Sequence, residues 1–179
     1  MRMERKPIFL ACFLCVIGIV CSGLIASVNQ VTEPIIQKRE QVEKEATILS
    51  FFNEMDHFIE ASVDREKYPA IRVVYEVFDQ QNNSLGQIYE LVTKGYGGDV
   101  SLLVAYDLKS QQLTHLSYIG TFSETPGFGS RVKEDEFLNQ VVEQPVESMK
   151  IDTLSGATIT SSAVKKAIEQ ANQHVLSES

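Results

Sequence analysis

Cysteine is missing from this chain beyond residue 21, and its three cysteines, Cys12, Cys15 and Cys21, all lie in an apolar N-terminal run. The later residues therefore have no disulfide and no thiolate ligand, which excludes an iron–sulfur cluster held by cysteine there. Cys12 and Cys15 have the spacing of a redox or metal pair, but no further ligands accompany them. Small apolar cysteines of a membrane helix are the better interpretation. Any redox role of the later residues would require another cofactor.

The chain also has little of what hydrolases, metalloenzymes and nucleic-acid-binding proteins need. Its three histidines, His57, His115 and His174, are scattered, and no Gly-x-Ser-x-Gly elbow, Walker loop or His-Glu-x-x-His helix occurs. The net charge of −8 argues against nucleic acid, which requires a basic surface. We expect no catalytic residue and no metal site in this chain, and no nucleic-acid partner.

Charge is absent from residues 7–32, and residues 8–28 are mostly apolar. Such a run matches the roughly 20 residues that cross a bilayer. A secretory signal is the competing interpretation, but its apolar region usually spans only about 7–15 residues. We therefore expect a retained, single-pass anchor in the cell (inner) membrane. The basic residues of segment 1–6 place that segment in the cytoplasm, and everything after Val28 on the extracytoplasmic side.

The chain is expected to have four parts: a cytoplasmic tail (1–6), a transmembrane helix (7–28), a juxtamembrane helical region (29–60) and one domain (61–179). Pro34 suits the first turn of the juxtamembrane helix. The apolar residues of that helix recur every seven positions, at Ile35, Val42 and Leu49. Such a thin stripe is typical of a helix that lies on a surface. The helix is either an interaction surface or a simple spacer.

From residue 68 to residue 119 the apolar residues alternate with polar ones, which predicts strands near 71–77, 87–93, 100–106 and 113–119. Turn-forming residues separate them, which favours hairpins of an antiparallel sheet. A helix is expected over 163–175, and the acidic residues 134–136 suit the start of a short helix. The fold class is α+β: an N-terminal transmembrane helix, then an extracytoplasmic domain with an antiparallel sheet flanked by helices.

The most informative stretch is residues 152–162. It holds an acidic residue, a turn of very small residues and then four hydroxyl side chains within residues 158–162, directly before the last predicted helix. The N-terminus of a helix binds anions, and small residues let a bulky ligand approach the backbone. The hydroxyl of Thr158 is placed to carry a phosphate ester. Ordinary helix capping by the same residues is the alternative.

Asp152, Ser155, Gly156, Ala157 and Thr158 resemble the flavinylation motif of the FMN-binding domain family. This domain is shared by the G subunit of the Rnf ion-translocating electron transport complex and the C subunit of the sodium-pumping NADH:quinone oxidoreductase. The resemblance implies that FMN is joined to Thr158 through a phosphoester, which a flavin transferase installs. It also implies that Asp152 is the acidic residue that the transferase needs.

Two further stretches, residues 94–98 and 124–129, are similar to glycine-rich loops of the same family. If the resemblance holds, an aromatic wall lines the flavin ring, made by Tyr96, Phe122 and Phe128. Glu124 and Thr125 then hydrogen-bond the edge of the ring. The eight residues expected to bind the cofactor are Thr158, Ser155, Gly156, Ala157, Asp152, Glu124, Thr125 and Tyr96.

The resemblance implies an electron-carrying subunit rather than an enzyme by itself. In an Rnf-type complex, electrons pass from ferredoxin to NAD, and this subunit relays them on the outer face through covalent FMN. Its partners are then the membrane and cytoplasmic subunits of the complex, and ion translocation belongs to them because a single anchor cannot move ions. Three alternatives stay open: a freestanding membrane-tethered flavoprotein, a C-type subunit of a quinone reductase, and an interaction domain without cofactor.

Overall fold

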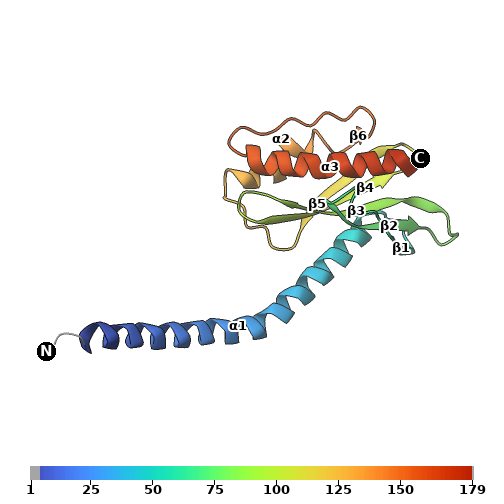
Figure 1. The fold of residues 1–179 in the computed structure, drawn as a ribbon. Coiled ribbons are helices and arrows are strands. Elements are labelled where there is room, and N and C mark those ends of the chain that lie inside the picture. The colour runs from blue at the N-terminus through green and yellow to red at the C-terminus, as the bar shows by residue number, and fades with distance from the viewer. Residues whose placement is uncertain (1–4, 179) are drawn as a thin grey trace. The chain divides into compact units, whose positions relative to one another are not determined.

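The computed structural model describes residues 5–178, which fall into two compact units, Met1–Val42 and Glu43–Ser179 (Figure 1). The first helix, α1 (Arg5–Phe51), extends through the first unit into the second. Pro34 lies inside α1, so the juxtamembrane helix does not begin at Pro34 but continues directly out of the apolar helix before it. Proline removes one backbone donor from a helix. Because Gln30, four residues earlier, is exposed, water can bond the carbonyl that this leaves free.

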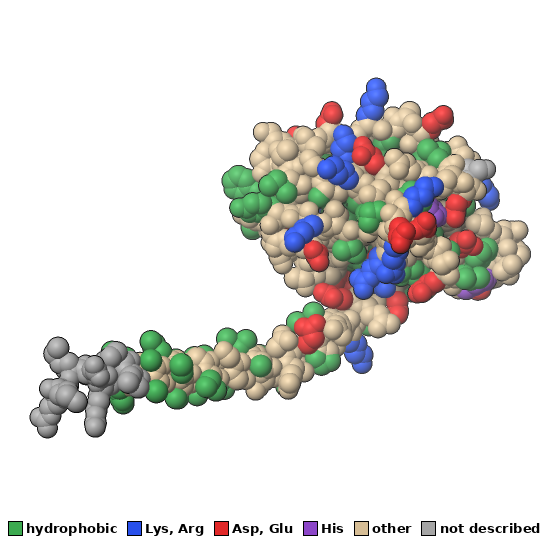
Figure 2. Space-filling view, in the orientation of Figure 1, with side chains coloured by type: hydrophobic (Ala, Val, Ile, Leu, Met, Phe, Trp, Pro, Cys, Tyr) green, Lys and Arg blue, Asp and Glu red, His purple; other side chains and the backbone are tan. Residues whose placement is uncertain are grey.

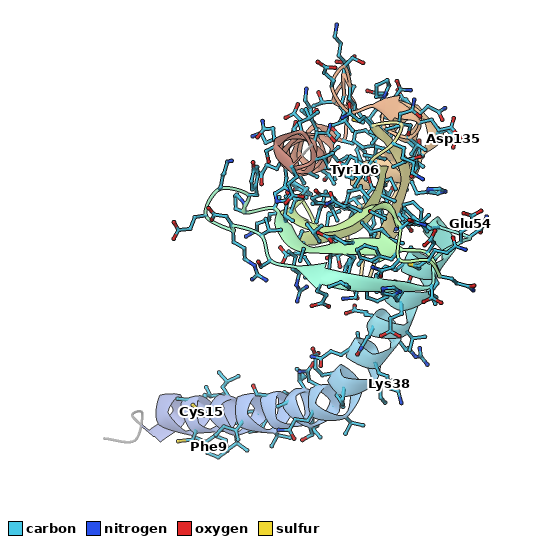
Figure 3. All side chains as sticks on the ribbon, turned by 90° about the vertical axis from the view of Figure 1, so that its right-hand side faces the viewer. Phe9, Cys15, Lys38, Glu54, Tyr106 and Asp135 are labelled. Atoms are coloured by element: carbon cyan, nitrogen blue, oxygen red, sulfur yellow. The ribbon has the colours of Figure 1, made fainter. Side chains whose placement is uncertain are left out.

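Residues 9–39 of α1, in the first unit, are all exposed. Hydrophobic side chains lie along the face of this helix that Figure 2 shows, and Cys15 lies on its surface (Figure 3). Among the described residues, α1 is the one helix that is long and apolar enough to cross a membrane. This agrees with the predicted N-terminal apolar helix.

The second unit begins with the last turns of α1, which pack on the sheet through a face that the sequence did not indicate. The predicted stripe of Ile35, Val42 and Leu49 is more than half exposed. Ile48 and Phe51 are buried instead, in a core cluster formed with one face of the sheet. The heptad stripe therefore does not make the contact with the sheet; Ile48 and Phe51, one and two positions from Leu49, make it instead.

The second unit contains a six-stranded antiparallel sheet whose strands follow one another in chain order. The predicted α+β class with an antiparallel sheet is confirmed. The helical region expected up to residue 60 is too long, because α1 ends at Phe51 and a strand follows. The strands are β1 (His57–Ala61), β2 (Ile71–Phe78), β3 (Ser84–Lys94), β4 (Asp99–Asp107), β5 (Gln112–Ile119) and β6 (Gln144–Pro145).

The other face of the sheet is covered by α3 (Thr158–Glu178) and holds the larger core cluster (Figure 1). Tyr106 lies between β4 and this helix (Figure 3), and its hydroxyl donates to Asn172 Oδ1 at 2.8 Å. A short helical segment, η1 (Gly129–Lys133), and α2 (Asp135–Leu138) follow β5. α2 begins within the acidic run, as the sequence predicted.

The last helix begins five residues earlier than expected, at Thr158. The hydroxyl residues that were expected to precede it form its first turn instead. Ser161 is the reason: its Oγ donates to the carbonyl of Ala157 at 2.9 Å and accepts from the N–H of Leu154 at 3.0 Å. A buried serine thus joins the preceding turn to the helix, and helical geometry starts at once.

Candidate functional site

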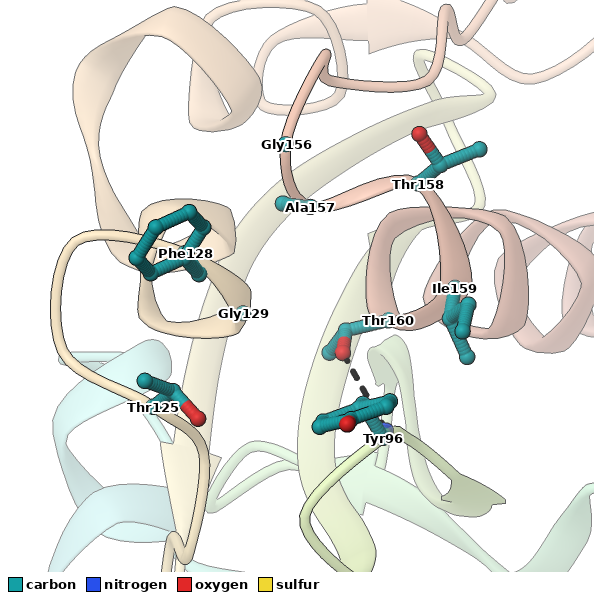
Figure 4. A pocket seen from close by; sticks show the side chains of 9 residues that line it. All are labelled: Tyr96, Thr125, Phe128, Gly129, Gly156, Ala157, Thr158, Ile159 and Thr160. Carbon is teal, nitrogen blue, oxygen red and sulfur yellow. Dashed lines mark hydrogen bonds between the residues drawn. The ribbon is translucent and has the colours of Figure 1, made fainter.

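A pocket of about 510 Å³ opens where three separate segments meet. The first is the turn between β3 and β4 (residues 95–98), here called the tyrosine loop. The second is the segment after β5 (residues 120–128), the phenylalanine loop. The third comprises the small-residue turn (residues 154–157) and the start of α3. The pocket is lined by Tyr96, Thr125, Phe128, Gly129, Gly156, Ala157, Thr158, Ile159 and Thr160 (Figure 4).

The small-residue turn depends on glycine and on a buried alanine. Gly156 has φ +81°, a conformation that other residues rarely adopt. A Cβ at this position would have no neighbour closer than 3.8 Å, so its backbone is open to the pocket. Ala157 is buried, and its N–H donates to the carbonyl of Leu154 at 3.0 Å. The backbone of this turn is therefore not covered by side chains, directly before α3 begins.

Thr158 is the first residue of α3 and is exposed. Its Oγ1 donates to the carbonyl of Leu154 at 3.3 Å. The first N–H groups of a helix lack partners within the helix and carry the positive end of its dipole. The hydroxyl thus lies at a place that favours a negatively charged group.

Arg131 anchors the small-residue turn from outside. Its guanidinium donates through Nη1 to the carbonyl of Ser155 and through Nη2 to Glu136 Oε2, and its Nε lies 3.8 Å from a carboxylate oxygen of Glu134. Arg131 belongs to η1, which begins at Gly129, the residue after Phe128. Its bond to the carbonyl of Ser155 therefore connects the small-residue turn to the end of the phenylalanine loop. No local pattern indicated this contact, since 24 positions separate Arg131 from Ser155.

The tyrosine loop is tied to α3 through a buried hydroxyl. The backbone N–H of Tyr96 donates to Oγ1 of Thr160 at 3.3 Å (Figure 4), and Thr160 is 1% exposed. The ring of Tyr96 is 73% exposed, so its backbone is fixed while its aromatic face remains free. Thr160 was not predicted as a site residue, because the sequence suggested only a run of capping hydroxyls.

Glu124 lies behind the pocket and does not line it. Its side chain is only 7% exposed, and Oε1 accepts the N–H of Gly97 at 3.1 Å. Its Oε2 is a buried oxygen without a hydrogen-bond partner among the described residues. A buried polar atom left unpaired costs about 1–3 kcal/mol. A Cβ on Gly95 would lie 2.1 Å from Oε1, and one on Gly129 would lie 2.0 Å from Oε2, so this carboxylate requires both glycines.

The apolar wall of the pocket differs in one member from the expected one. Tyr96 and Phe128 line the pocket, and Figure 4 shows them on opposite sides of it. Phe122 does not line it: its ring packs edge-on against Tyr118, with Nζ of Lys133 3.9 Å from the ring centre. Ile159, which is 59% exposed, lines the pocket instead. The signal for Ile159 in the sequence was that it is an apolar residue within a run of hydroxyl residues.

Of the eight residues predicted to bind the cofactor, the structure places five at the pocket: Tyr96, Thr125, Gly156, Ala157 and Thr158. Three do not line it: Asp152, Ser155 and Glu124. Ser155 and Asp152 are exposed near the turn, and the N–H of Asp152 donates to Gln140 Oε1 at 2.7 Å. Their roles, like those of the five, stay predictions.

Comparison with known proteins identifies the domain. Residues 95–173, which include all nine pocket residues, match the FMN-binding domain family. The family resemblance seen in the sequence is confirmed, and the cofactor is FMN.

The chain is also similar to two relatives over nearly its whole length. It is 29% identical to the G subunit of the proton-translocating ferredoxin:NAD(+) oxidoreductase complex of Clostridium ljungdahlii, covering 95% of this chain and 89% of the relative. It is 28% identical to the G subunit of the ion-translocating oxidoreductase complex of Methanosarcina acetivorans, covering 89% of each. The crystal structure of Shewanella oneidensis NqrC superposes with a TM-score of 0.46 at 16% identity, covering 71% of this chain and 74% of NqrC.

The residues around the pocket fit FMN. The volume lies within the range of about 300–1,000 Å³ that small-molecule sites occupy. Tyr96, Phe128 and Ile159 offer apolar surface to a flat ring, and aromatic faces favour offset stacking. Gly156 leaves the backbone accessible, and the N-terminus of α3 suits a phosphate. One end of the pocket is thus suited to the ring of FMN and the other to its phosphate.

Proposed function

We propose that this chain is the electron-carrying G-type subunit of an ion-translocating ferredoxin:NAD oxidoreductase and that its FMN is joined through the phosphate to Oγ1 of Thr158. The names of both relatives, and their similarity along almost the full chain, support the first part. The position of Thr158 supports the second: an exposed hydroxyl on the first residue of a 21-residue helix, at the rim of the pocket. This position is the single observation that carries the attachment.

The attachment is a phosphoryl transfer with an activated donor. Oγ1 of Thr158 attacks the flavin-bearing phosphorus of a flavin dinucleotide, and the phosphoanhydride bond breaks. A nucleoside monophosphate leaves, and the hydroxyl proton passes to a base of the flavin transferase. Asp152 is exposed six residues before Thr158, where the transferase can reach it. The helix N-terminus favours the phosphodiester because its free N–H groups face a negative charge.

The protein's contribution to electron transfer is to hold and orient the cofactor. FMN supplies the one-electron exchange. Tyr96 and Phe128 hold the ring between them, and Ile159 keeps water from one edge. The ester at Thr158 prevents loss of the cofactor. These contacts keep the flavin ring at one place in the complex. A cofactor that passes electrons between two partners requires such a fixed position.

The proposed location and partners follow from the anchor. Residues 7–28 cross the membrane, residues 1–6 lie in the cytoplasm and the FMN-binding domain lies on the outer face. Ion translocation belongs to the partner subunits. Purification in mild detergent tests this arrangement, because a G-type subunit co-purifies with integral membrane subunits. A chain that always purifies alone favours a freestanding membrane-tethered flavoprotein instead.

Replacing Thr158 by alanine tests the attachment. The full chain, produced in cells that contain the flavin transferase, should give a fluorescent band in a denaturing gel. Thr158→Ala should abolish the band because no other bond holds FMN through denaturation. Thr153→Ala is the matched control, since Thr153 is also exposed and lies five residues away; its band should persist. A fluorescent Thr158→Ala band would move the attachment to another residue, and a dark wild-type band would refute covalent binding.

A further inference from the structure

The side-chain oxygens of two buried residues, Glu124 behind the pocket and Thr160 in its lining, lie beside the same glycine. A Cβ built on Gly129 would lie 2.0 Å from Glu124 Oε2 and 3.0 Å from Thr160 Oγ1. Both oxygens, one from the segment after β5 and one from α3, therefore lie close to the place that a side chain on Gly129 would occupy. Both residues are buried, at 7% and 1% exposure. Neither an apolar side chain nor a bulky one fits between them.

The hydrogen-bonding capacities of the two oxygens are complementary. Within the described residues, Oε2 accepts no hydrogen bond. Oγ1 of Thr160 accepts the N–H of Tyr96 at 3.3 Å, and no bond donated by this hydroxyl is found among residues 9–178. A hydroxyl both donates and accepts, while a carboxylate oxygen only accepts. One bond from Thr160 Oγ1 to Oε2 would satisfy the second oxygen without breaking the contact to Tyr96.

Each residue is connected to one wall of the pocket. Thr160 holds the backbone of Tyr96, and Glu124 Oε2 occupies the place that a side chain on Gly129, next to Phe128, would need. Glu124 also holds the tyrosine loop from behind, through the bond from Gly97 N–H to Oε1. The two residues thus join the tyrosine loop, the phenylalanine loop and α3. A change in their separation changes the distance between the two aromatic walls.

We propose that Glu124 and Thr160 form a carboxylate–hydroxyl latch that sets the spacing of the Tyr96 and Phe128 walls around the flavin ring. The proposal rests on the proposed function, because the ring is the group between the walls. Closing the latch moves the hydroxyl proton of Thr160 into a hydrogen bond with Oε2. Glu124 is then a positioning residue that acts through both loops and does not touch the ring, in contrast to the ring-edge contact that the sequence suggested.

The test uses the full chain in detergent, made in cells that contain the flavin transferase. The variants are Glu124→Ala, Thr160→Val, Thr160→Ser and the double variant Glu124→Ala/Thr160→Val. Attached flavin is measured in a denaturing gel and used to normalise each sample. The readout is quenching of the native flavin fluorescence by iodide, which reports how closely the walls enclose the ring. Thermal unfolding identifies any variant that fails to fold.

Glu124→Ala and Thr160→Val should each raise iodide quenching severalfold, because either opens the latch. Thr160→Ser should restore the wild-type value, since it keeps the hydroxyl. The double variant should raise quenching by less than the sum of the two single variants, because the bond between the residues is lost in each of them, while the bonds to Gly97 and Tyr96 are each lost in only one. Unchanged quenching in both single variants, additive effects in the double variant, or failure of Thr160→Ser to restore quenching would overturn the latch.

A second measurement separates the latch from the covalent attachment. Free FMN is titrated into Thr158→Ala chains with and without Glu124→Ala or Thr160→Val. The latch predicts severalfold weaker binding in each combined variant. Equal binding would overturn it. A dark wild-type band in the denaturing gel would refute the attachment alone, and this titration would still decide the latch.

Discussion

Two buried glutamates of the same domain differ in how well their oxygens are paired. Glu90, on β3, is 4% exposed and has partners on both oxygens. Oε2 accepts from Lys44 Nζ at 3.2 Å and from the hydroxyl of Tyr75 at 3.1 Å, and Oε1 lies 3.5 Å from Arg72 Nη1. Glu124 is almost as buried, but one of its oxygens has a single N–H donor and the other has none within the described residues.

The difference in pairing between Glu90 and Glu124 corresponds to their different positions in the fold. Glu90 lies where the end of α1 packs on the sheet, so its three partners join Lys44 of the helix to β2 and β3. Glu124 lies behind the pocket, next to the loops that surround it. A carboxylate with partners on both oxygens holds two elements together. A carboxylate with an unpaired oxygen can still accept a hydrogen bond that forms later. The comparison therefore separates a structural carboxylate from one that serves the site.

The largest expected effect is on stability, from Glu90→Ala. Removing this carboxylate leaves Lys44 and Tyr75 with only the hydrogen bond between them. A hydrogen bond to a charged group contributes about 1.5–3 kcal/mol, and we expect a loss of that size because Lys44 and Arg72 still reach solvent. Glu124→Ala should lose about 1 kcal/mol or less, because removing an unpaired oxygen offsets the lost N–H bond.

Chemical unfolding of the full chain in detergent measures both losses. Glu66→Ala is the control, since Glu66 is exposed and surface changes usually stay within about 0.5 kcal/mol. If Glu124→Ala destabilises the domain as much as Glu90→Ala does, the two carboxylates are equivalent in the fold and the comparison fails.

Much of this fold could be predicted from the sequence. The parts that could not be predicted are contacts between residues that lie far apart along the chain. The period-two pattern predicted β2 to β5, because alternation reports directly on a sheet with one buried face. β6 has two residues and is too short for any pattern. Glu124 and Thr160 were visible as a loop glutamate and a capping threonine. Their juxtaposition depends on how α3 packs, which no local pattern contains.

A smaller effect is expected from Gly129→Ala, and it tests whether Glu124 fills the space beside this glycine. The new Cβ would lie 2.0 Å from Oε2, so the carboxylate must move. Overpacking costs about 1–3 kcal/mol, and the flexible end of the glutamate places this case near the lower limit. Glu124→Ala should rescue the variant, because it removes the colliding atoms.

Thermal unfolding of the single and double variants measures this rescue. Gly23→Ala is the control, because its Cβ would meet nothing within 4 Å. A double variant with the summed losses of its two single variants would show that the glycine is required for another reason.

The smallest effect is a pH dependence that distinguishes Glu90 from Glu124, because Glu90 has two partners whose pKa values are raised. Burial lowers the pKa of Lys44, but its hydrogen bond to Tyr75 and the charge of Glu90 outweigh burial, so the pKa is raised above its ordinary 10.5. Burial raises the pKa of Tyr75 above its ordinary 10.0. A raised pKa stabilises the fold below the ordinary value, and this contribution is lost as the pH rises through the folded-state pKa.

Stability should therefore fall more steeply above pH 10 in the wild type than in Lys44→Met, which lacks the cation. The contribution is modest, because Lys44 is partly exposed and solvent screens its charge. Melting temperatures measured from neutral pH to beyond 10.5 give the two curves. Glu124→Ala should follow the wild-type curve, since no salt bridge to Glu124 occurs among the described residues. Parallel curves for Lys44→Met and the wild type would show that pairing at Glu90 depends on its neutral hydrogen bonds rather than on charge.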